Sequence, residues 1–260
     1  MLISTDLENC LGNYIFKPEN LFMKTLALLL LSFVTLKLEA QNFKLTDKSI
    51  VKDSSGTIYP AAVWQALYMK GDYDFKAENP KDANTAFILV RLSEKEKEKR
   101  FERMPKPKES DFFKTGKKLA LFDAKDIEGN SIDLTSARGK IIVLNFWFIN
   151  CGPCRREIPE LNVLVDSFKK NENVLFVAVA LDSKAALQNF LEKMPFNYSI
   201  VDGRAIASNY GVRLYPTHVI LDTEGKVYFH TSGLAMNTIY WIKKSIKELL
   251  VKAEKDVAAQ

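Results

Sequence analysis

The sequence is poor in cysteine and histidine, with three cysteines and two histidines in 260 residues. Small secreted domains that depend on disulfides for stability use many more cysteines. A structural zinc site needs four ligands, and beyond residue 40 the chain offers only Cys151, Cys154, His218 and His230. The two histidines are twelve residues apart on separate strand candidates, unlike the usual close spacing. We therefore predict neither a disulfide scaffold nor a metal site.

A concentrated positive charge and a nucleotide-binding fingerprint are also lacking. The net charge is +5, from 37 basic and 32 acidic residues that are scattered along the chain. No basic patch interleaved with aromatic residues predicts a nucleic-acid face. No glycine-rich phosphate-binding motif follows a strand candidate. The sequence therefore predicts no nucleic-acid partner and no bound cofactor.

No apolar run near the N-terminus is long enough to span a bilayer. The uncharged run of residues 25–36 is leucine-rich, but it falls short of the roughly 20 residues that a spanning helix needs. With Lys24 before it and Ala40 after it, residues 23–40 are typical of a signal peptide. Residues 1–22 then precede the true start, and cleavage after Ala40 would remove Cys10. The chain is predicted to be periplasmic or otherwise exported, with membrane contact only if this leader stays uncleaved.

Residues 41–112 are predicted to form a small α+β region of unknown role. Strands are expected at 49–51, 57–59 and 85–92, and helices at 61–70 and, capped by Ser93, at 94–103. Trp64 and Tyr68 on the first helix are assigned to a core rather than to a partner-docking patch. The charged run 94–100 is assigned to a solvated helix face, and residues 104–108 to a linker.

From residue 113 to 256 the chain alternates strand and helix candidates. Two short strands flank the turn at Gly129-Asn130, and the buried strands 140–148 and 174–181 follow. A hairpin is expected at 217–221 and 226–231. Helices are predicted at 151–169, 183–193, 204–210 and 236–251. The predicted fold class is therefore α/β, with a central sheet of mixed direction flanked by helices.

The motif Cys151-Gly152-Pro153-Cys154 lies where a buried strand meets a helix N-terminus. Free backbone N–H groups and the helix dipole stabilise a thiolate there, and the thiolate is the nucleophile of disulfide exchange. Cys154 lies about one turn further on, so it can attack a mixed disulfide formed by Cys151. This context favours a redox pair over an inert structural disulfide.

Glu157 lies three residues after Cys154, which makes the two side chains neighbours on a helix. A carboxylate in this place could accept the proton of Cys154 as that thiol becomes a nucleophile. A surface or salt-bridged glutamate is the alternative, and the spacing alone does not choose between them.

The segment NFWFINCGPCRREIPELN, residues 145–162, resembles the thioredoxin superfamily, and most closely the TlpA/ResA group of exported thiol-disulfide oxidoreductases. The resemblance spans roughly residues 119–250 and includes Pro159, which matches the helix-kinking proline of the family. It implies a thioredoxin-like domain at 113–256. Glu157 matches the acid of the group near the buried cysteine.

The segment LYPTHVILDTEGKV, residues 214–227, resembles the part of the family that carries a cis-proline. The resemblance implies that Pro216 is this proline, flanked by Tyr215 and Thr217, and that its loop faces the cysteines and binds the substrate backbone. Two positions depart from relatives. Asn145 replaces the buried aspartate of plain thioredoxin, and Asn150 replaces a tryptophan before the first cysteine. His218 could tune the redox pair or bind a metal, but a structural role is favoured for it, and the same role is assigned to His230.

These observations predict a thiol-disulfide oxidoreductase of the reducing type, which acts on protein disulfides through Cys151 and Cys154. Its electrons would come from a membrane or exported thiol protein, as the resemblance implies. An oxidase or isomerase is one alternative, because the Gly-Pro dipeptide does not fix the potential. A non-catalytic binding module is another, although the intact cysteine pair, Glu157 and Pro216 argue against it. A peroxidase is weaker still, since no isolated peroxidatic cysteine stands out.

Overall fold

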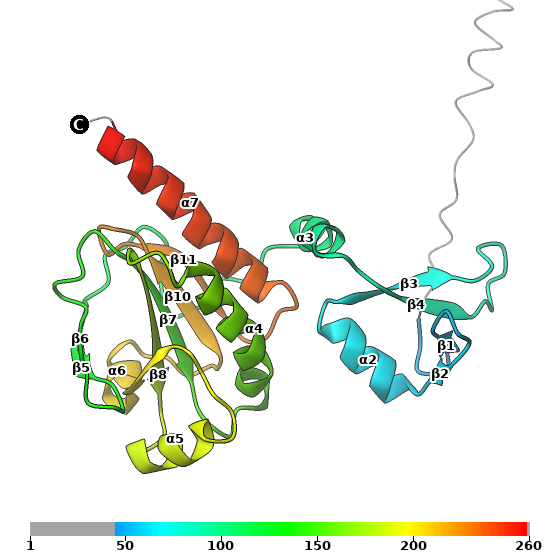
Figure 1. Cartoon of the computed structure of the whole chain (residues 1–260), viewed down its shortest axis with the longest axis horizontal. Helices are drawn as coiled ribbons and strands as arrows, with labels where there is room; N and C mark the ends of the chain where they lie inside the picture. Colours follow the sequence, from blue (N-terminus) through cyan, green and yellow to red (C-terminus); the bar gives the residue numbers. More distant parts are fainter. Residues whose placement is uncertain (1–44, 259–260) are drawn as a thin grey trace, which may run out of the picture.

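The computed structural model describes residues 45–258, which fold around a four-stranded and a five-stranded sheet, with a further two-stranded sheet (Figure 1). The predicted leader at residues 1–40 and Cys10 lie outside the described residues. Within residues 45–258, no helix is both long enough and apolar enough to cross a membrane. The boundaries proposed at residues 41–112 and 113–256 stay predictions.

The first sheet belongs to the N-terminal part of the chain and has the strand order β2-β1-β4-β3. Its elements are β1 (Val51–Lys52), β2 (Ile58–Tyr59), α2 (Ala61–Met69), β3 (Tyr73–Ala77) and β4 (Phe87–Arg91). The predicted hairpin, helix and third strand are all present. Trp64 on α2 is buried with Val51, Phe87 and Leu89, so its assignment to a core is confirmed.

Strand β3 was not predicted from the sequence. Tyr73 and Phe75 on it pack against the core of the first sheet, and Phe75 makes ring contacts with Trp64 and Tyr68 of α2. The intervening Asp74 is exposed. The strand therefore follows the period-two alternation of a half-buried strand, with charged residues interrupting its apolar run.

Helix α3 (Glu94–Arg103) connects the two sheets. Ser93 and Glu96 form the reciprocal capping box that fixes its N-terminus. Phe101 is the buried residue of the helix and lies against the ring of Tyr240. Most of the charged run is exposed, as predicted, but Lys97 and Arg100 are half-buried and donate to Asp72 and to the carbonyl of Tyr73. Phe101 attaches the helix to the C-terminal part.

The segment after α3 is largely exposed but is held at several points by hydrogen bonds, which the prediction of a linker does not anticipate. The side-chain amide of Asn237 donates to the backbone carbonyls of Phe101 and Pro105. The hydroxyl of Thr231 donates to the carbonyl of Lys108, and the Ser110 amide donates to Nδ1 of His230. These bonds hold residues 101–110 against the C-terminal part of the chain.

The second sheet has five strands in the order β11-β10-β7-β8-β9. They are β7 (Ile141–Trp147), β8 (Val174–Ala180), β9 (Ser199–Asp202), β10 (Thr217–Leu221) and β11 (Val227–Ser232). Strands β7, β8 and β9 are parallel, and β10 is antiparallel to both β7 and β11. The mixed sheet is as predicted, except that the four-residue edge strand β9 was missed.

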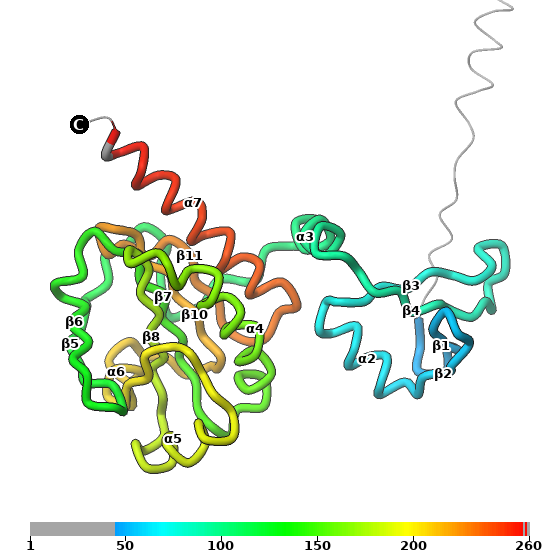
Figure 2. Tube along the Cα trace, viewed as in Figure 1, coloured from blue at the N-terminus to red at the C-terminus, as the bar shows by residue number. Residues whose placement is uncertain are grey.

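The remaining elements of the C-terminal part lie around this sheet, and Figure 2 shows the path of the chain through them. They are β5 (Asp123–Lys125), β6 (Ser131–Asp133), α4 (Gly152–Phe168), α5 (Lys184–Leu191), α6 (Arg204–Asn209) and α7 (Thr238–Ala258). Each corresponds to a predicted element. Helix α7 continues seven residues beyond the predicted end at residue 251.

The two faces of the second sheet bury different side chains of β7. Ile141, Val143 and Trp147 pack with apolar residues of α4 and α7, whereas Leu144 and Phe146 pack on the opposite face with residues such as Ala207 of α6. Every residue of β7 is buried. The strand that leads to the cysteine motif is therefore the centre of the fold, held from both sides.

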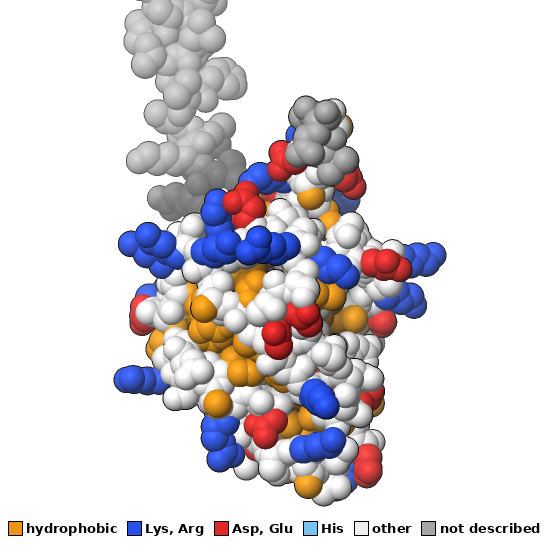
Figure 3. All heavy atoms as spheres, turned by 90° about the vertical axis from the view of Figure 1, so that its left-hand side faces the viewer, with side chains coloured by type: hydrophobic (Ala, Val, Ile, Leu, Met, Phe, Trp, Pro, Cys, Tyr) orange, Lys and Arg blue, Asp and Glu red, His pale blue; other side chains and the backbone are white. Residues whose placement is uncertain are grey.

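The face of the molecule shown in Figure 3 mixes Lys and Arg side chains with Asp and Glu side chains around a stretch of apolar surface. Positive charge is therefore interspersed with negative charge on this face, as the scattered charges of the sequence predict.

Candidate functional site

Cys151 and Cys154 form a disulfide at the start of α4, with their Cα atoms 5.3 Å apart. Cys151 is the N-cap residue of the helix, and Pro153 lies in its first turn, where a missing N–H costs nothing. The Cys154 amide donates to Sγ of Cys151 across 3.2 Å. Such a bond and the helix dipole stabilise negative charge on Cys151 sulfur when the pair is reduced.

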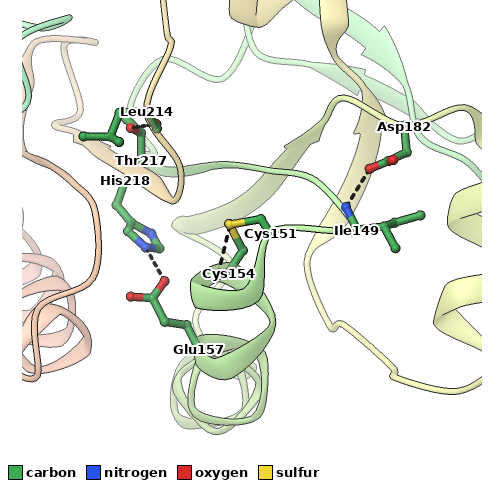
Figure 4. Close-up of a disulfide and its surroundings, with 8 residues drawn as sticks. All are labelled: Ile149, Cys151, Cys154, Glu157, Asp182, Leu214, Thr217 and His218. Carbon is green, nitrogen blue, oxygen red and sulfur yellow. Dashed lines mark hydrogen bonds and ion pairs between the residues drawn. A yellow bond between two sulfur atoms is a disulfide. The ribbon is translucent and has the colours of Figure 1, made fainter. Parts of the chain in front are cut away.

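The loop between β7 and Cys151 is anchored to the end of β8 (Figure 4). The Ile149 amide donates to Oδ2 of Asp182 at 2.7 Å, and the Leu181 amide donates to the carbonyl of Trp147. Both bonds fix the chain just before the motif. The position of Cys151 therefore depends on two neighbouring parallel strands.

Glu157 is buried within α4, one turn after Cys154, with 5% of its surface exposed. Its Oε2 lies 2.9 Å from Nε2 of His218, and the two side chains point toward one another (Figure 4). The histidine itself is fully buried. The glutamate is thus an internal acid paired with a histidine, not a residue of the surface.

The sequence names tuning of the redox pair as an alternative for His218, but it does not predict the contact of this histidine with Glu157. Its partner is 61 residues away in the chain. The alternation of β10 offers the clue, because Ile220 packs on the α4 face and Val219 and Leu221 pack on the opposite face. A residue two before Ile220 shares its face, which directs His218 toward α4.

Asn145 lies directly opposite His218 in the register between β7 and β10. It is buried, and its side-chain oxygen has no hydrogen-bond partner among the described residues. The position where plain thioredoxin is expected to hold an aspartate is therefore neutral here, and the buried acid of this chain comes from α4.

Two further ionisable groups respond to the Glu157 charge. Burial raises the pKa of the Tyr198 phenol, and the Glu157 carboxylate raises it further. Burial also raises the pKa of Glu160. The charge of Lys97 lowers this pKa in part, and the charge of Glu157 raises it. The interior beside α4 is therefore poorly solvated, and charges there are only weakly screened from one another.

The Tyr215–Pro216 peptide bond is cis, as the resemblance implies. Tyr215 packs edge-on against Phe148, three residues before Cys151, and its hydroxyl donates to the carbonyl of Val212. Thr217 is fully buried, and its hydroxyl bonds to Leu214 and Ser232. Of the predicted loop residues, Tyr215 is thus attached to the loop that carries the cysteines, whereas the Thr217 side chain serves the sheet.

His230, on β11, lies in a different environment from His218. Its Nδ1 accepts the Ser110 amide, and its Nε2 is 3.7 Å from Glu109. Burial lowers the pKa of this histidine. The charge of Glu109 raises this pKa, and the charge of Lys106 lowers it further. Its assignment to a structural role agrees with these contacts. Within residues 45–258, no group of three or more His, Cys, Asp or Glu side chains is arranged to hold a metal ion.

Comparison with known proteins places this site in a family. The family model described as AhpC/TSA matches residues 115–230. The thiol-disulfide oxidoreductase ResA of Halalkalibacterium halodurans is 28% identical over 137 residues, which cover 52% of this chain and 78% of the relative. ResA of Bacillus thuringiensis subsp. konkukian is 33% identical over 120 residues, 45% of this chain and 69% of the relative. This chain belongs to the ResA family of thiol-disulfide oxidoreductases.

The fold of this ResA-family protein also has a match among solved structures. The solution structure of a candidate protein disulfide isomerase from Bacteroides thetaiotaomicron aligns with a TM-score of 0.50 and 21% identity, over 55% of this chain and 94% of that chain. The match supports the thioredoxin-like fold. With relatives that are thiol-disulfide oxidoreductases and a cysteine pair at disulfide distance, this ResA-family protein is an oxidoreductase of the same class.

Proposed function

We propose that this chain is an exported reductase of protein disulfides. The observation that carries the proposal is a disulfide at the N-terminus of α4 with a buried acid one turn below it. A helix N-terminus favours the thiolate of Cys151, and a buried carboxylate offers a base to Cys154. The combination suits a pair of cysteines that cycles between thiols and disulfide.

In the proposed reaction, the Cys151 thiolate attacks a substrate disulfide and forms a mixed disulfide, and one substrate thiolate leaves. Cys154 then attacks Sγ of Cys151 and gives its proton to Glu157, which releases the second substrate thiolate. The substrate gains two electrons, and Cys151 and Cys154 end as the disulfide seen in the structure. The free substrate thiolates take up protons from water.

The substrate is proposed to lie across the loop of Pro216. Leu214, two residues before the proline, is 52% exposed, and Tyr215 joins this loop to Phe148. An extended peptide bound beside Pro216 would bring its disulfide to Cys151. An unfolded or flexible protein segment fits such a surface better than a small thiol compound, because the main chain of the segment can pair with the loop.

A second thiol protein must restore the reduced state, since the chain shows no nucleotide fingerprint through which it could draw electrons itself. We propose a membrane or exported electron donor for this step. Export through the predicted leader at residues 23–40 would place the chain where protein disulfides form and persist.

Trapping with a Cys154→Ser variant tests the proposal, because the variant can attack a substrate but cannot release it. We expect mixed disulfides between Cys151 and exported proteins, visible on non-reducing gels and lost on reduction. The matched control is Cys151→Ser, which should trap nothing. Equal trapping by both variants would contradict the assigned roles, and no trapping by either would favour the non-catalytic binding module.

A further inference from the structure

The pair formed by Glu157 and His218 is buried on every side. His218 contributes no exposed surface and Glu157 only 5%. Each side chain has one polar atom in the shared contact and one without any hydrogen-bond partner in the described part of the chain, Oε1 of Glu157 and Nδ1 of His218. A buried pair with so few partners is costly, so a purely structural purpose is a poor explanation for it.

The contact between Nε2 and Oε2 suits the tautomer of His218 that carries its proton on Nε2. In this tautomer Nε2–H donates to Oε2 of Glu157, and Nδ1, which has no partner among the described residues, has no proton to donate. This bond fixes the orientation of the carboxylate within α4, which a flexible glutamate would not otherwise keep.

We propose that His218 is a positioning residue for Glu157, holding its carboxylate where it accepts the proton of Cys154. This inference rests on the proposed function and extends it to a residue on another element. His218 touches no reacting sulfur in the proposal, and it acts through Glu157 alone. The two residues come from β10 and α4, so the fold itself assembles the base.

The step balances in atoms and electrons. As the Cys154 sulfur bonds to Sγ of Cys151, its S–H proton passes to Glu157, the bond between Cys151 and the substrate breaks, and the substrate leaves as a thiolate. The two cysteines lose two electrons and the substrate gains them. When a donor dithiol later reduces the pair, Cys154 leaves as a thiolate and recovers the proton from Glu157.

The other groups that face this pair do not replace His218. Tyr198 is buried, and its hydroxyl has no hydrogen-bond partner in the described residues. Asn145 lies opposite His218 on β7 but cannot titrate. Glu160 adds a like charge on the same helix as Glu157. His218 is thus the group in hydrogen-bond contact with the carboxylate.

Two nearly isosteric substitutions separate positioning from packing. In His218→Gln, the side-chain amide reaches the place of Nε2 and can still donate to Glu157. In His218→Asn, the amide reaches only the place of Nδ1 and the bond is lost. Both variants keep a polar side chain of similar size, which guards against a simple failure to fold. His230→Asn is the matched control, because its oxygen can replace Nδ1 as the acceptor of the Ser110 amide.

The experiment is single-turnover reaction of each reduced protein with Ellman's disulfide across a pH series. The first thionitrobenzoate released reports attack by Cys151, and the second reports resolution by Cys154. We expect His218→Asn to slow the second phase by about tenfold or more, on the scale of general base catalysis, and to change its pH profile. In His218→Gln and His230→Asn, the rate of the second phase should stay within about twofold of the wild-type rate, which is small beside the effect of a lost general base.

The positioning role would be overturned if His218→Asn released the second thionitrobenzoate at the wild-type rate. It would also be overturned if His218→Asn and His218→Gln slowed this release equally. In a Glu157→Gln background, His218→Asn should slow the second phase no further, and additive slowing would overturn it too. The proposed function fails separately. If the second phase with Ellman's disulfide depends on His218 as expected but the wild-type protein cannot reduce protein disulfides, the proposed substrate class is refuted and the positioning role stands.

Discussion

The hydrogen bond between the Ile149 amide and Asp182 supports the position of Cys151, and its removal has a size that can be worked out. Asp182→Ala leaves the Ile149 N–H without the carboxylate that accepts it at 2.7 Å. Hydrogen bonds to charged groups contribute about 1.5 to 3 kcal/mol. Because this site is only partly buried, water can replace some of the loss, and we expect the lower end of that range.

Urea unfolding of the oxidised protein measures the loss, with Asp182→Asn as the control. Asparagine keeps an oxygen that accepts the Ile149 N–H, and it removes the same charge as alanine does. We therefore expect Asp182→Ala to unfold at lower urea than Asp182→Asn. The same comparison should show slower attack by Cys151 in the alanine variant. If the two variants unfold together and react alike, the loop does not depend on this bond and the reasoning is refuted.

Three further predictions concern the proton acceptor and the segment after α3. Glu157→Gln should slow the second thionitrobenzoate release by about 100-fold and leave the first unchanged; slowing of the first phase alone would contradict its role. Burial lowers the pKa of His230, so below pH 6.5 the unfolded chain binds a proton that the folded chain does not. Stability should therefore fall as the pH drops from 6.5 to the lowered value, and urea unfolding of His230→Asn should show a weaker slope; an unchanged slope would assign the effect to other groups. Asn237→Ala removes the amide that donates to the backbone carbonyls of Phe101 and Pro105, and it should lower the free energy of unfolding by about 1 to 3 kcal/mol. We expect unfolding at lower urea and faster proteolysis at residues 104–110. Unchanged cleavage would mean that other contacts hold the segment.

The part of the fold that carries the cysteines follows from local sequence. The strand β7 is apolar at nearly every position, which is typical of a strand buried on both faces, and Pro153 after Cys151 marks a helix start. The hairpin of β10 and β11 follows from two apolar runs around Asp222-Thr223-Glu224-Gly225. These features depend on neighbours in the chain, so the sequence is enough to predict them.

Other features depend on partners that are distant in the chain. His218 pairs with Glu157 because β10 lies beside β7 and under α4. The alternation of β10 places His218 on the same face as Ile220, but it does not identify the partner on that face. The short edge strand β9 owes its pairing to β8. The residues after α3 are polar and proline-rich, typical of a linker, and only the buried Asn237, Thr231 and His230 reveal that they are bound.

The reduction potential of the Cys151–Cys154 pair decides whether this protein can act as a reductase. The protein lacking residues 1–40 would be equilibrated with a dithiol buffer of known potential and its thiols counted. We predict one reversible two-electron couple near that of thioredoxin, about −270 mV. A value near −120 mV, which is typical of a strong oxidant, would contradict the proposed reductase and favour an oxidase.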